Sequence, residues 1–151
     1  MVQTRREIRE KAMQVLYAYE ISQEPVEMLL ESIAGEELND DEEQYRFAQA
    51  LVFTTLNHRS EADELIRMKA TNWDIDRIAT LDRVLLRLGV AEFLYFPDIP
   101  TKVTINECVE IAKRFSTEQS GRFVNGILDS ILSTLNAEGR IRKQGRGLMN
   151  S

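Results

Sequence analysis

Apolar residues are densest at residues 81–96, which read LDRVLLRLGVAEFLYF. Eleven of these sixteen positions are apolar, and a helix that is apolar around most of its circumference has to be buried by its neighbours. Thr80 can serve as an N-cap and Pro97 cannot continue a helix, so the pattern predicts a helix rather than a strand. We interpret this segment as a central hub helix with other helices packed around it. Its few charged residues are expected to emerge along a narrow strip that another protein could contact.

Amphipathic patterns predict the other helices. Their expected positions are residues 4–21, 25–35 and 41–57, the segments after Ser60-x-x-Asp63 and Thr104-x-x-Glu107, and the segment from Ser116 or Thr117 onward. The second of these helices starts at Pro25 and is expected to end at Gly35. No segment alternates apolar and polar residues as a strand would. The chain is therefore predicted to be all-α, with about seven helices.

Several single residues can be interpreted from their positions in the pattern, and for Tyr17 both a structural and a functional interpretation stay open. Tyr17 lies opposite the apolar stripe of the first helix, as does Met13, so Tyr17 either packs on a neighbouring helix or offers a surface for stacking. Cys108 lies on an apolar stripe and is interpreted as a small buried residue. Trp73, in a loop before the hub, is predicted to plug the core. Gly126 interrupts the last helix, which a close helix crossing would explain.

Length and charge narrow the possibilities. A chain of 151 residues suits one domain, predicted here over residues 1–137. Residues 35–44 hold six carboxylates without the spacing of a calcium loop, so a solvated loop is expected there. Residues 138–151 carry four basic side chains and one acidic one, and are expected to form a basic, flexible tail. The net charge of −6 does not suit general coating of nucleic acid, but it leaves room for a local site.

Motifs for catalysis, cofactors and metal binding are not found in the sequence. It has no phosphate-binding loop, no HExxH and no nucleophile elbow, and one histidine (His58) and one cysteine offer few ligands to a metal. We therefore expect a protein that is not an enzyme, holds no cofactor and acts by binding. The sequence also has no long uncharged apolar run and no apolar signal peptide, so a cytoplasmic protein without membrane contact is expected.

Two segments combine basic and aromatic residues in a way that suits single-stranded nucleic acid. The first helix begins with Arg5, Arg6 and Arg9, whose guanidinium groups are suited to phosphate. Residues 116–126, STEQSGRFVNG, open the last helix, where free N–H groups and the helix dipole favour anions. Taken alone, both signals are also compatible with solvated helix ends and with a core position for Phe123.

Three long segments of the chain together form a recognisable family pattern: REIREKAMQVLYAYE (6–20), WDIDRIATLDRVLLRLGVAEF (73–93) and PTKVTINECVEIAKRFSTEQSGRFVNGILD (100–129). Through these segments the chain resembles the NusB family of bacterial transcription antitermination factors. It implies seven helices in two three-helix subdomains. It also implies binding of the boxA segment of nascent ribosomal RNA together with NusE, a small-subunit ribosomal protein, within an antitermination complex on RNA polymerase.

The resemblance assigns roles to particular residues. Residues at the starts of the first and last helices are expected to contact RNA; they are Arg5, Arg6, Arg9, Tyr17, Gln119, Ser120, Arg122 and Phe123. NusE is expected to dock beside the hub, at Asp76, Asp82 and Arg83. Glu7 and Glu10 dilute the first basic cluster, and Gln119 stands where a carboxylate is common in the family.

Two alternatives remain at this stage. The chain could be a helical adaptor that binds only proteins, or a stand-alone relative of the RNA-binding domain of ribosomal RNA cytosine methyltransferases. Salt-dependent binding of boxA-like RNA separates the adaptor from the other two. A homodimer of the free protein also remains possible.

Overall fold

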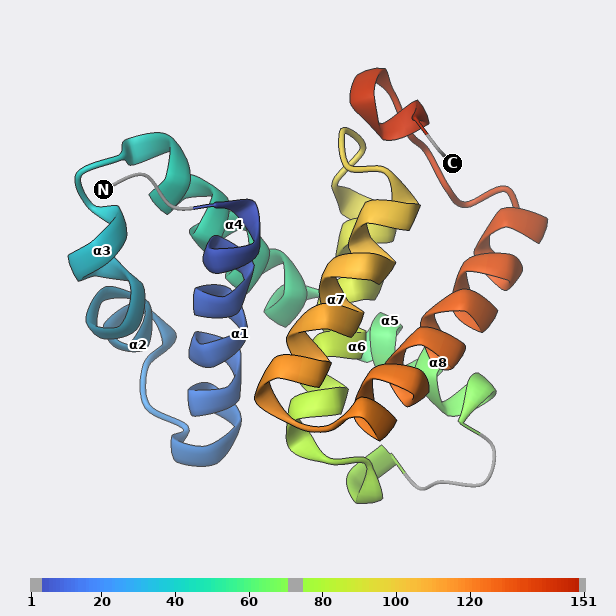
Figure 1. The fold of residues 1–151 in the computed structure, drawn as a ribbon, viewed down its shortest axis with the longest axis horizontal. Coiled ribbons are helices and arrows are strands. Elements are labelled where there is room, and N and C mark those ends of the chain that lie inside the picture. Colours follow the sequence, from blue (N-terminus) through green and yellow to red (C-terminus); the bar gives the residue numbers. More distant parts are fainter. Residues whose placement is uncertain (1–3, 71–74, 150–151) are drawn as a thin grey trace. The chain divides into compact units, whose positions relative to one another are not determined.

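The computed structural model describes residues 4–70 and 75–149, and these residues form helices and no strand (Figure 1). The all-α prediction is confirmed. The chain divides into two compact units, Met1–Asn57 and His58–Ser151. Within the described parts, the first unit holds α1 (Arg5–Ser22), α2 (Val26–Leu30), the π-helix η1 (Glu31–Gly35), α3 (Glu36–Leu38) and α4 (Glu42–Asn57). The second holds α5 (Arg59–Lys69), the 3-10 turn η2 (Ile75–Arg77), α6 (Thr80–Tyr95), α7 (Thr101–Phe115), α8 (Glu118–Ala137) and the 3-10 turn η3 (Gly145–Leu148). Trp73 lies outside the described residues.

In the first unit, α1 packs against α2, η1 and α4. Ile8, Ala12, Val15 and Leu16 are buried, as the apolar stripe predicts. Met13 is also buried, at 2% exposure, so its expected position opposite the core is wrong.

The second helical segment of this unit does not end at Gly35. It continues without interruption from α2 through the π-helix η1 into α3, which ends at Leu38. The side chain of Glu31 folds over Gly35 and accepts hydrogen bonds from Asn39 Nδ2 at 3.1 Å and Tyr45 Oη at 3.2 Å. Polar contacts that the helical period does not reveal therefore hold the start of the acidic segment 35–44 in a helix.

The hub of the second unit is α6, which packs against α5, α7 and α8. Leu85, Leu86 and Leu88 are completely buried, and the helix runs one residue ahead of the predicted range at each end. Its N-cap is Ala79 rather than Thr80. Cys108 is buried on α7 and its Sγ lies 3.7 Å from the Leu85 carbonyl oxygen, as expected of a core residue.

Both capping boxes predicted in this unit are wrong. α5 begins at Arg59, ahead of Ser60, and α7 begins at Thr101, so Thr104 lies inside the helix. The buried Thr104 hydroxyl donates to Glu92 Oε1 at 2.6 Å instead of capping a helix. A threonine followed three residues later by a glutamate suits a helix start, but here the threonine serves a buried carboxylate.

The close helix crossing lies at Gly89 and not at Gly126. A Cβ at Gly89 would stand 2.8 Å from Leu128 Cδ2, whereas a Cβ at Gly126 would meet no atom within 4 Å. Gly89 therefore allows α6 and α8 to approach closely, and the crossing predicted at Gly126 is wrong. The glycine at position 126 has no packing explanation.

The basic segment after α8 is bonded to the rest of its unit. Lys143 Nζ donates to the Glu92 and Phe96 carbonyl oxygens, both at 2.9 Å, and the Gln144 amide donates to Pro97 O at 3.0 Å. A Cβ at Gly147 would stand 1.8 Å from Pro97 O, so only glycine fits there. Burial lowers the pKa of Lys143 to about 8. The structure thus differs from the expected loose tail, because lysine and backbone groups satisfy carbonyls at the end of α6.

Candidate nucleic-acid interface

Two arginines share one aromatic ring at the start of α1. The Arg5 guanidinium carbon lies 3.8 Å from the centroid of the Phe47 ring, and that of Arg9 lies 5.6 Å from it. Phe47 belongs to α4 of the same unit, so the tertiary packing of α1 on α4 brings the three side chains together. Arg5 is exposed, whereas Arg9 is 2% exposed. Stacking on a ring limits the freedom of Arg5 while its N–H groups stay accessible to phosphate.

Glu7 is used in the cap of α1. Its backbone N–H donates to Thr4 Oγ1 at 3.1 Å and its carboxylate accepts from the Thr4 amide at 3.0 Å, which completes a capping box. The carboxylate that dilutes the basic cluster in the sequence therefore satisfies the helix end. Arg6 is exposed beside it.

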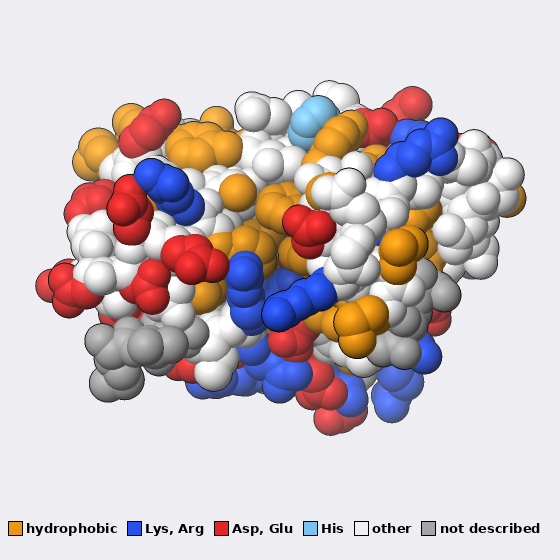
Figure 2. Space-filling model, turned by 90° about the horizontal axis from the view of Figure 1, so that it is seen from above, with side chains coloured by type: hydrophobic (Ala, Val, Ile, Leu, Met, Phe, Trp, Pro, Cys, Tyr) orange, Lys and Arg blue, Asp and Glu red, His pale blue; other side chains and the backbone are white. Residues whose placement is uncertain are grey.

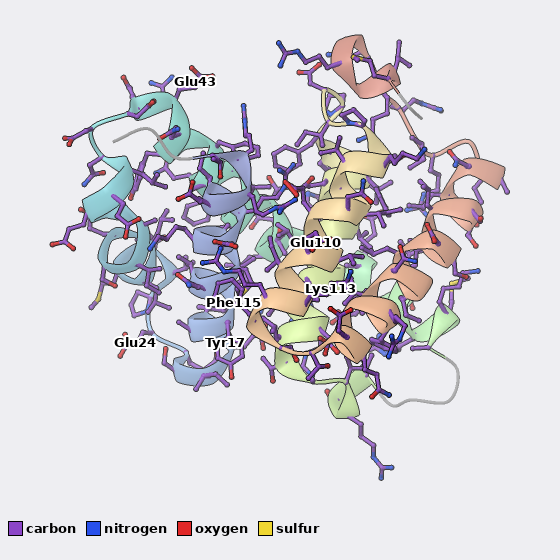
Figure 3. All side chains as sticks on the ribbon, in the orientation of Figure 1. Tyr17, Glu24, Glu43, Glu110, Lys113 and Phe115 are labelled. Atoms are coloured by element: carbon purple, nitrogen blue, oxygen red, sulfur yellow. The ribbon has the colours of Figure 1, made fainter. Side chains whose placement is uncertain are left out.

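Tyr17 lies farther along the same helix and is 41% exposed (Figure 3). This exposure agrees with a side chain at the surface and disagrees with a core position. Tyr19, the other aromatic residue of α1, is half-buried.

At the other candidate segment, the turn between α7 and α8 is held by hydroxyl groups. Thr117 caps α8 by accepting a hydrogen bond from the Ser120 amide at 3.0 Å. The Ser116 and Ser120 hydroxyls lie 2.9 Å apart, and the Ser120 hydroxyl donates to Asp82 Oδ2 at 3.3 Å. The predicted helix start is confirmed, and a chain of hydroxyls connects it to the first turn of the hub.

These groups surround a hollow of about 410 Å³, which we call the α6–α8 hollow. It collects residues from η2, the start of α6, the α7–α8 turn and α8, and its lining is Arg77, Ile78, Ala79, Asp82, Ser116, Thr117, Gln119, Ser120 and Phe123. The family resemblance implies a protein partner at Asp82 and RNA contacts at Gln119, Ser120 and Phe123. The structure places all four on the same hollow.

Asp82 is buried in this hollow and not exposed as expected. It is 7% exposed, and its Oδ1 atom is covered and has no hydrogen-bond partner among the described residues. Desolvation raises the pKa of this carboxyl group, and the hydrogen bond from Ser120 partly offsets the rise. A buried carboxylate oxygen without a partner costs free energy, so Asp82 is poorly satisfied in the free protein.

The remaining charges of the hub do not form an open strip. Arg87 makes a bidentate ion pair with Asp63 of α5, with N–O distances of 2.7 and 2.9 Å. Glu92 is fully buried, and Arg83 Nη1 donates to the carbonyl oxygens of Ile75 and Ile78. The predicted strip is therefore wrong, because these side chains tie the hub to its own unit. Asp76 on η2 remains exposed.

The start of α8 also carries an electrostatic link to α7. Lys113 Nζ lies 3.8 Å from Glu110 Oε1, and Figure 3 labels both residues. The same Nζ lies 3.9 Å from Glu118 Oε2. The aliphatic part of Lys113 passes over Gly121, where an added Cβ would stand 2.7 Å from Lys113 Cγ. Arg122, the next residue, is exposed. It is not among the residues that line the hollow.

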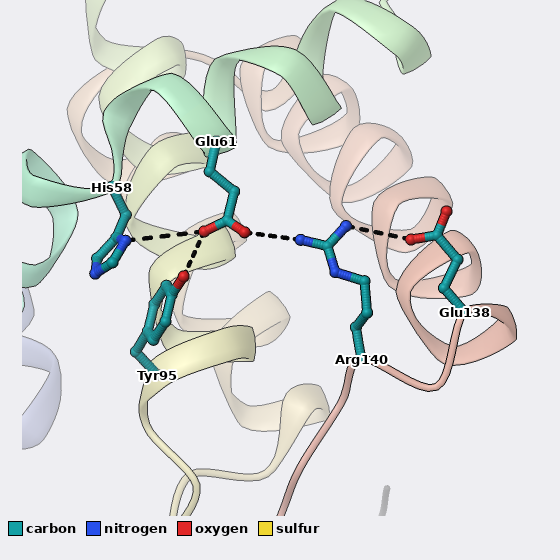
Figure 4. A network of polar contacts seen from close by, with 5 residues as sticks. All are labelled: His58, Glu61, Tyr95, Glu138 and Arg140. Atoms are coloured by element: carbon teal, nitrogen blue, oxygen red, sulfur yellow. Dashed lines mark hydrogen bonds and ion pairs between the residues drawn. The ribbon is translucent and has the colours of Figure 1, made fainter.

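His58 belongs to a polar network that joins the start of α5 to the end of α6 (Figure 4). His58 stacks on Tyr95 with ring centroids 3.9 Å apart, and the Tyr95 hydroxyl donates to Glu61 at 2.5 Å. Arg140 forms ion pairs with both glutamates: Nη2 lies 2.8 Å from Glu61 Oε2, and Nη1 lies 3.2 Å from Glu138 Oε1. The imidazole, pale blue in Figure 2, is 39% exposed, and its Nδ1 lies 3.8 Å from Glu61 Oε1.

Sequence reasoning missed two residues of these sites. Phe47 supports the arginines from another helix, and Arg77 lines the hollow from the 3-10 turn. The helical period could not find them, because it describes each helix separately. Arg77 stands five residues before Asp82, and this proximity is the one sequence signal that could have suggested it.

Comparison with known families identifies the architecture. The model of the NusB family matches residues 6–133. The chain belongs to the NusB family. The match includes the α1 arginines Arg6 and Arg9 and every residue that lines the α6–α8 hollow.

Similarity to individual NusB proteins extends over nearly the whole chain. The transcription antitermination protein NusB of Salinibacter ruber is 45% identical over 97% of this chain and 91% of its own length. The NusB protein of Chloroherpeton thalassium is 42% identical over 99% of this chain and 71% of its own length. The fold is similar to that of a chain in the crystal structure of the antitermination factors NusB and NusE in complex with dsRNA. The TM-score is 0.79 and the sequence identity is 30%, and the match covers 89% of this chain and 99% of that chain.

No helix in the described part of the chain is both long enough and apolar enough to cross a membrane.

Proposed function

We propose that the chain is a transcription antitermination factor that binds boxA-type nascent ribosomal RNA together with NusE, within an antitermination complex on RNA polymerase. The observation that carries this proposal is the identity of 42% and 45% to NusB proteins over nearly the whole chain. A related fold in complex with NusE and dsRNA supports the two kinds of partner. A factor of this kind works by binding and not by catalysis, in the cytoplasm where nascent RNA is made.

In this proposal both units serve one RNA-binding domain over residues 1–137. The RNA contacts are those predicted from the sequence at the start of α1 and at the start of α8. Arg5 and Arg6 are exposed and supply charge, and Tyr17 supplies an exposed ring. Arg9 is buried, so its contribution is to pack with Phe47 more than to reach a phosphate directly.

The NusE contacts are proposed at Asp76 and at neighbouring charges of η2 and the first turn of α6. Asp76 is exposed and acidic, which suits a basic ribosomal protein. Arg83 holds the η2 turn through two carbonyl oxygens and so positions Asp76. Asp82 is too deeply placed to form part of a flat protein interface before any rearrangement.

A titration of single-stranded boxA-like RNA, with and without NusE, tests the proposal. We expect salt-dependent RNA binding that NusE strengthens. Binding of NusE without any RNA binding would instead support a protein-binding adaptor. Light scattering on the same preparation tests for a homodimer of the free protein.

A further inference from the structure

The α6–α8 hollow has the chemistry of a pocket for a planar polar ring. Ile78, Ala79 and Phe123 form its apolar part, and Asp82, Gln119 and Ser120 supply polar groups. Its volume of about 410 Å³ exceeds that of one nucleobase. Bases of single-stranded RNA are read in this way, by stacking against aromatic or apolar side chains and by hydrogen bonds to their edges.

Asp82 decides which base fits. An ionised carboxylate accepts hydrogen bonds through two oxygens and donates none. In the free protein, Oδ1 has no partner among the described residues, and Oδ2 receives one long bond of 3.3 Å from Ser120. The carboxylate therefore keeps acceptor capacity on both oxygens, at a place where water is largely excluded. A ligand with two adjacent donors would satisfy both oxygens at once.

Among the four RNA bases, guanine is the one that presents two adjacent donors, N1–H and the N2 amine, on its Watson–Crick edge. Adenine and cytosine each place a donor beside an acceptor, and uracil places its donor between two acceptors. The Gln119 amide and Arg77 carry donors for the O6 acceptor of the same edge. We propose that the α6–α8 hollow selects a guanine base of the bound RNA and that Asp82 is its specificity-determining residue.

Binding in this way needs a small rearrangement. Oδ1 is covered, so both oxygens reach the ligand only when the carboxylate turns about its Cβ–Cγ bond. That turn gives up the 3.3 Å bond to Ser120, and Asp82 has no other polar partner among the residues that the structure describes. The Ser120 hydroxyl keeps Ser116 as a neighbour at 2.9 Å. The free protein therefore holds Asp82 in place only weakly.

This inference rests on the proposed RNA binding and reassigns Asp82 from the protein partner to RNA. The test replaces each guanosine of a boxA-like RNA in turn by inosine, which lacks the N2 amine and keeps N1–H and O6. At one position we expect affinity to fall about tenfold, since one hydrogen bond to a charged group is removed. In Asp82→Asn this penalty should disappear, because an amide cannot accept both donors. Asp129→Asn, which removes an exposed carboxylate of α8 outside the hollow, is the matched control and should keep the penalty.

A second measurement examines the hollow without a complete RNA. Guanosine monophosphate should shift the backbone amide signal of Ser120 in the parent protein, and inosine monophosphate should shift it less at the same concentration. Equal inosine penalties in the parent and Asp82→Asn, or no penalty at any position, would overturn the inference while RNA binding itself still supports the proposed function. Lower NusE affinity in Asp82→Asn with an unchanged inosine penalty would return Asp82 to the protein partner. A protein that binds no RNA contradicts the proposed function, and the two mononucleotides then test the hollow alone.

Discussion

The start of α1 and the α6–α8 hollow belong to different units and offer nucleic acid two different kinds of contact. At the start of α1, the exposed Arg5 stacks on Phe47 and presents a charge to solvent. In the hollow, Asp82 is buried with one unpartnered oxygen among hydroxyl and amide groups of the described residues. Charge at a surface attracts any phosphate, whereas a recessed acceptor distinguishes ligands by their donors. Affinity is thus expected to come mainly from the first region and selectivity from the second.

The largest expected effect concerns the packing on which the hollow depends. Gly89→Ala places a Cβ 2.8 Å from Leu128 and should lower the free energy of unfolding by about 1–3 kcal/mol. Gly126→Ala in the facing helix meets no atom and should raise stability by up to about 1 kcal/mol. Denaturant unfolding of both variants measures the difference. Equal effects would show that α6 and α8 are not in close contact at Gly89.

The next effect separates the two roles open to Phe123. The ring is half-buried and lines the hollow, so Phe123→Ala should cost less than the roughly 3–5 kcal/mol of a fully buried phenylalanine. RNA binding should weaken by about 1–3 kcal/mol if the ring supports a base. Unfolding and RNA affinity are measured on one preparation. A full loss of stability with normal RNA affinity of the folded fraction would assign Phe123 to the core.

A smaller effect is expected at Phe47, whose ring packs against the arginines at the start of α1. Phe47→Leu keeps an apolar side chain and removes the ring under Arg5 and Arg9, an interaction of about 0.5–1 kcal/mol. RNA affinity should fall by about two- to fivefold, with a nearly unchanged salt dependence because every charge is kept. An RNA titration at two salt concentrations checks this. Unchanged affinity would mean that the ring does not position the arginines.

The smallest effect is a pH dependence from Asp82. Its pKa is raised in the folded state by desolvation, so the folded protein binds this proton more tightly than the unfolded chain does. The unfavourable contribution of the charged carboxylate is therefore absent at low pH and grows as pH rises through the folded pKa. The stability of Asp82→Asn relative to the parent should rise between about pH 4 and pH 7. A constant difference over this range would contradict the burial of a charged carboxylate.

The helices were predictable from the sequence because their apolar stripes are long and regular. The hub, the helix from Arg5 to Ser22 and the start of the last helix after Ser116 or Thr117 follow from local pattern alone. The errors arise where the role of a residue is set by its contact with another helix. Thr104 serves Glu92 and not a cap, and the close crossing falls at Gly89 because Leu128 stands opposite it. Neither partner lies within the same helical segment.

The candidate sites show the same limit. The arginines and the start of α8 were found as clusters along the sequence, but the ring under the arginines lies about forty residues away. Asp82 was expected at the surface because the few charged residues of the apolar hub were predicted to lie on one exposed strip. Its burial results from the α7–α8 turn, which brings Ser120 to it from 38 residues away. Long-range packing of this kind leaves no local signal.

The most direct test of the division between affinity and selectivity is the salt dependence of RNA affinity in two variants. Arg5, Arg6 and Arg9 are replaced together by alanine in one variant, and Gln119 alone is replaced by alanine in the other. In the arginine variant, the slope of log affinity against log salt should flatten by about 0.7 for each single-strand phosphate that the protein no longer neutralises, with the larger part from the exposed Arg5 and Arg6. Gln119→Ala should weaken binding at every salt concentration and leave the slope unchanged. An unchanged slope in the arginine variant, or a flatter one in Gln119→Ala, would contradict the division between the two regions.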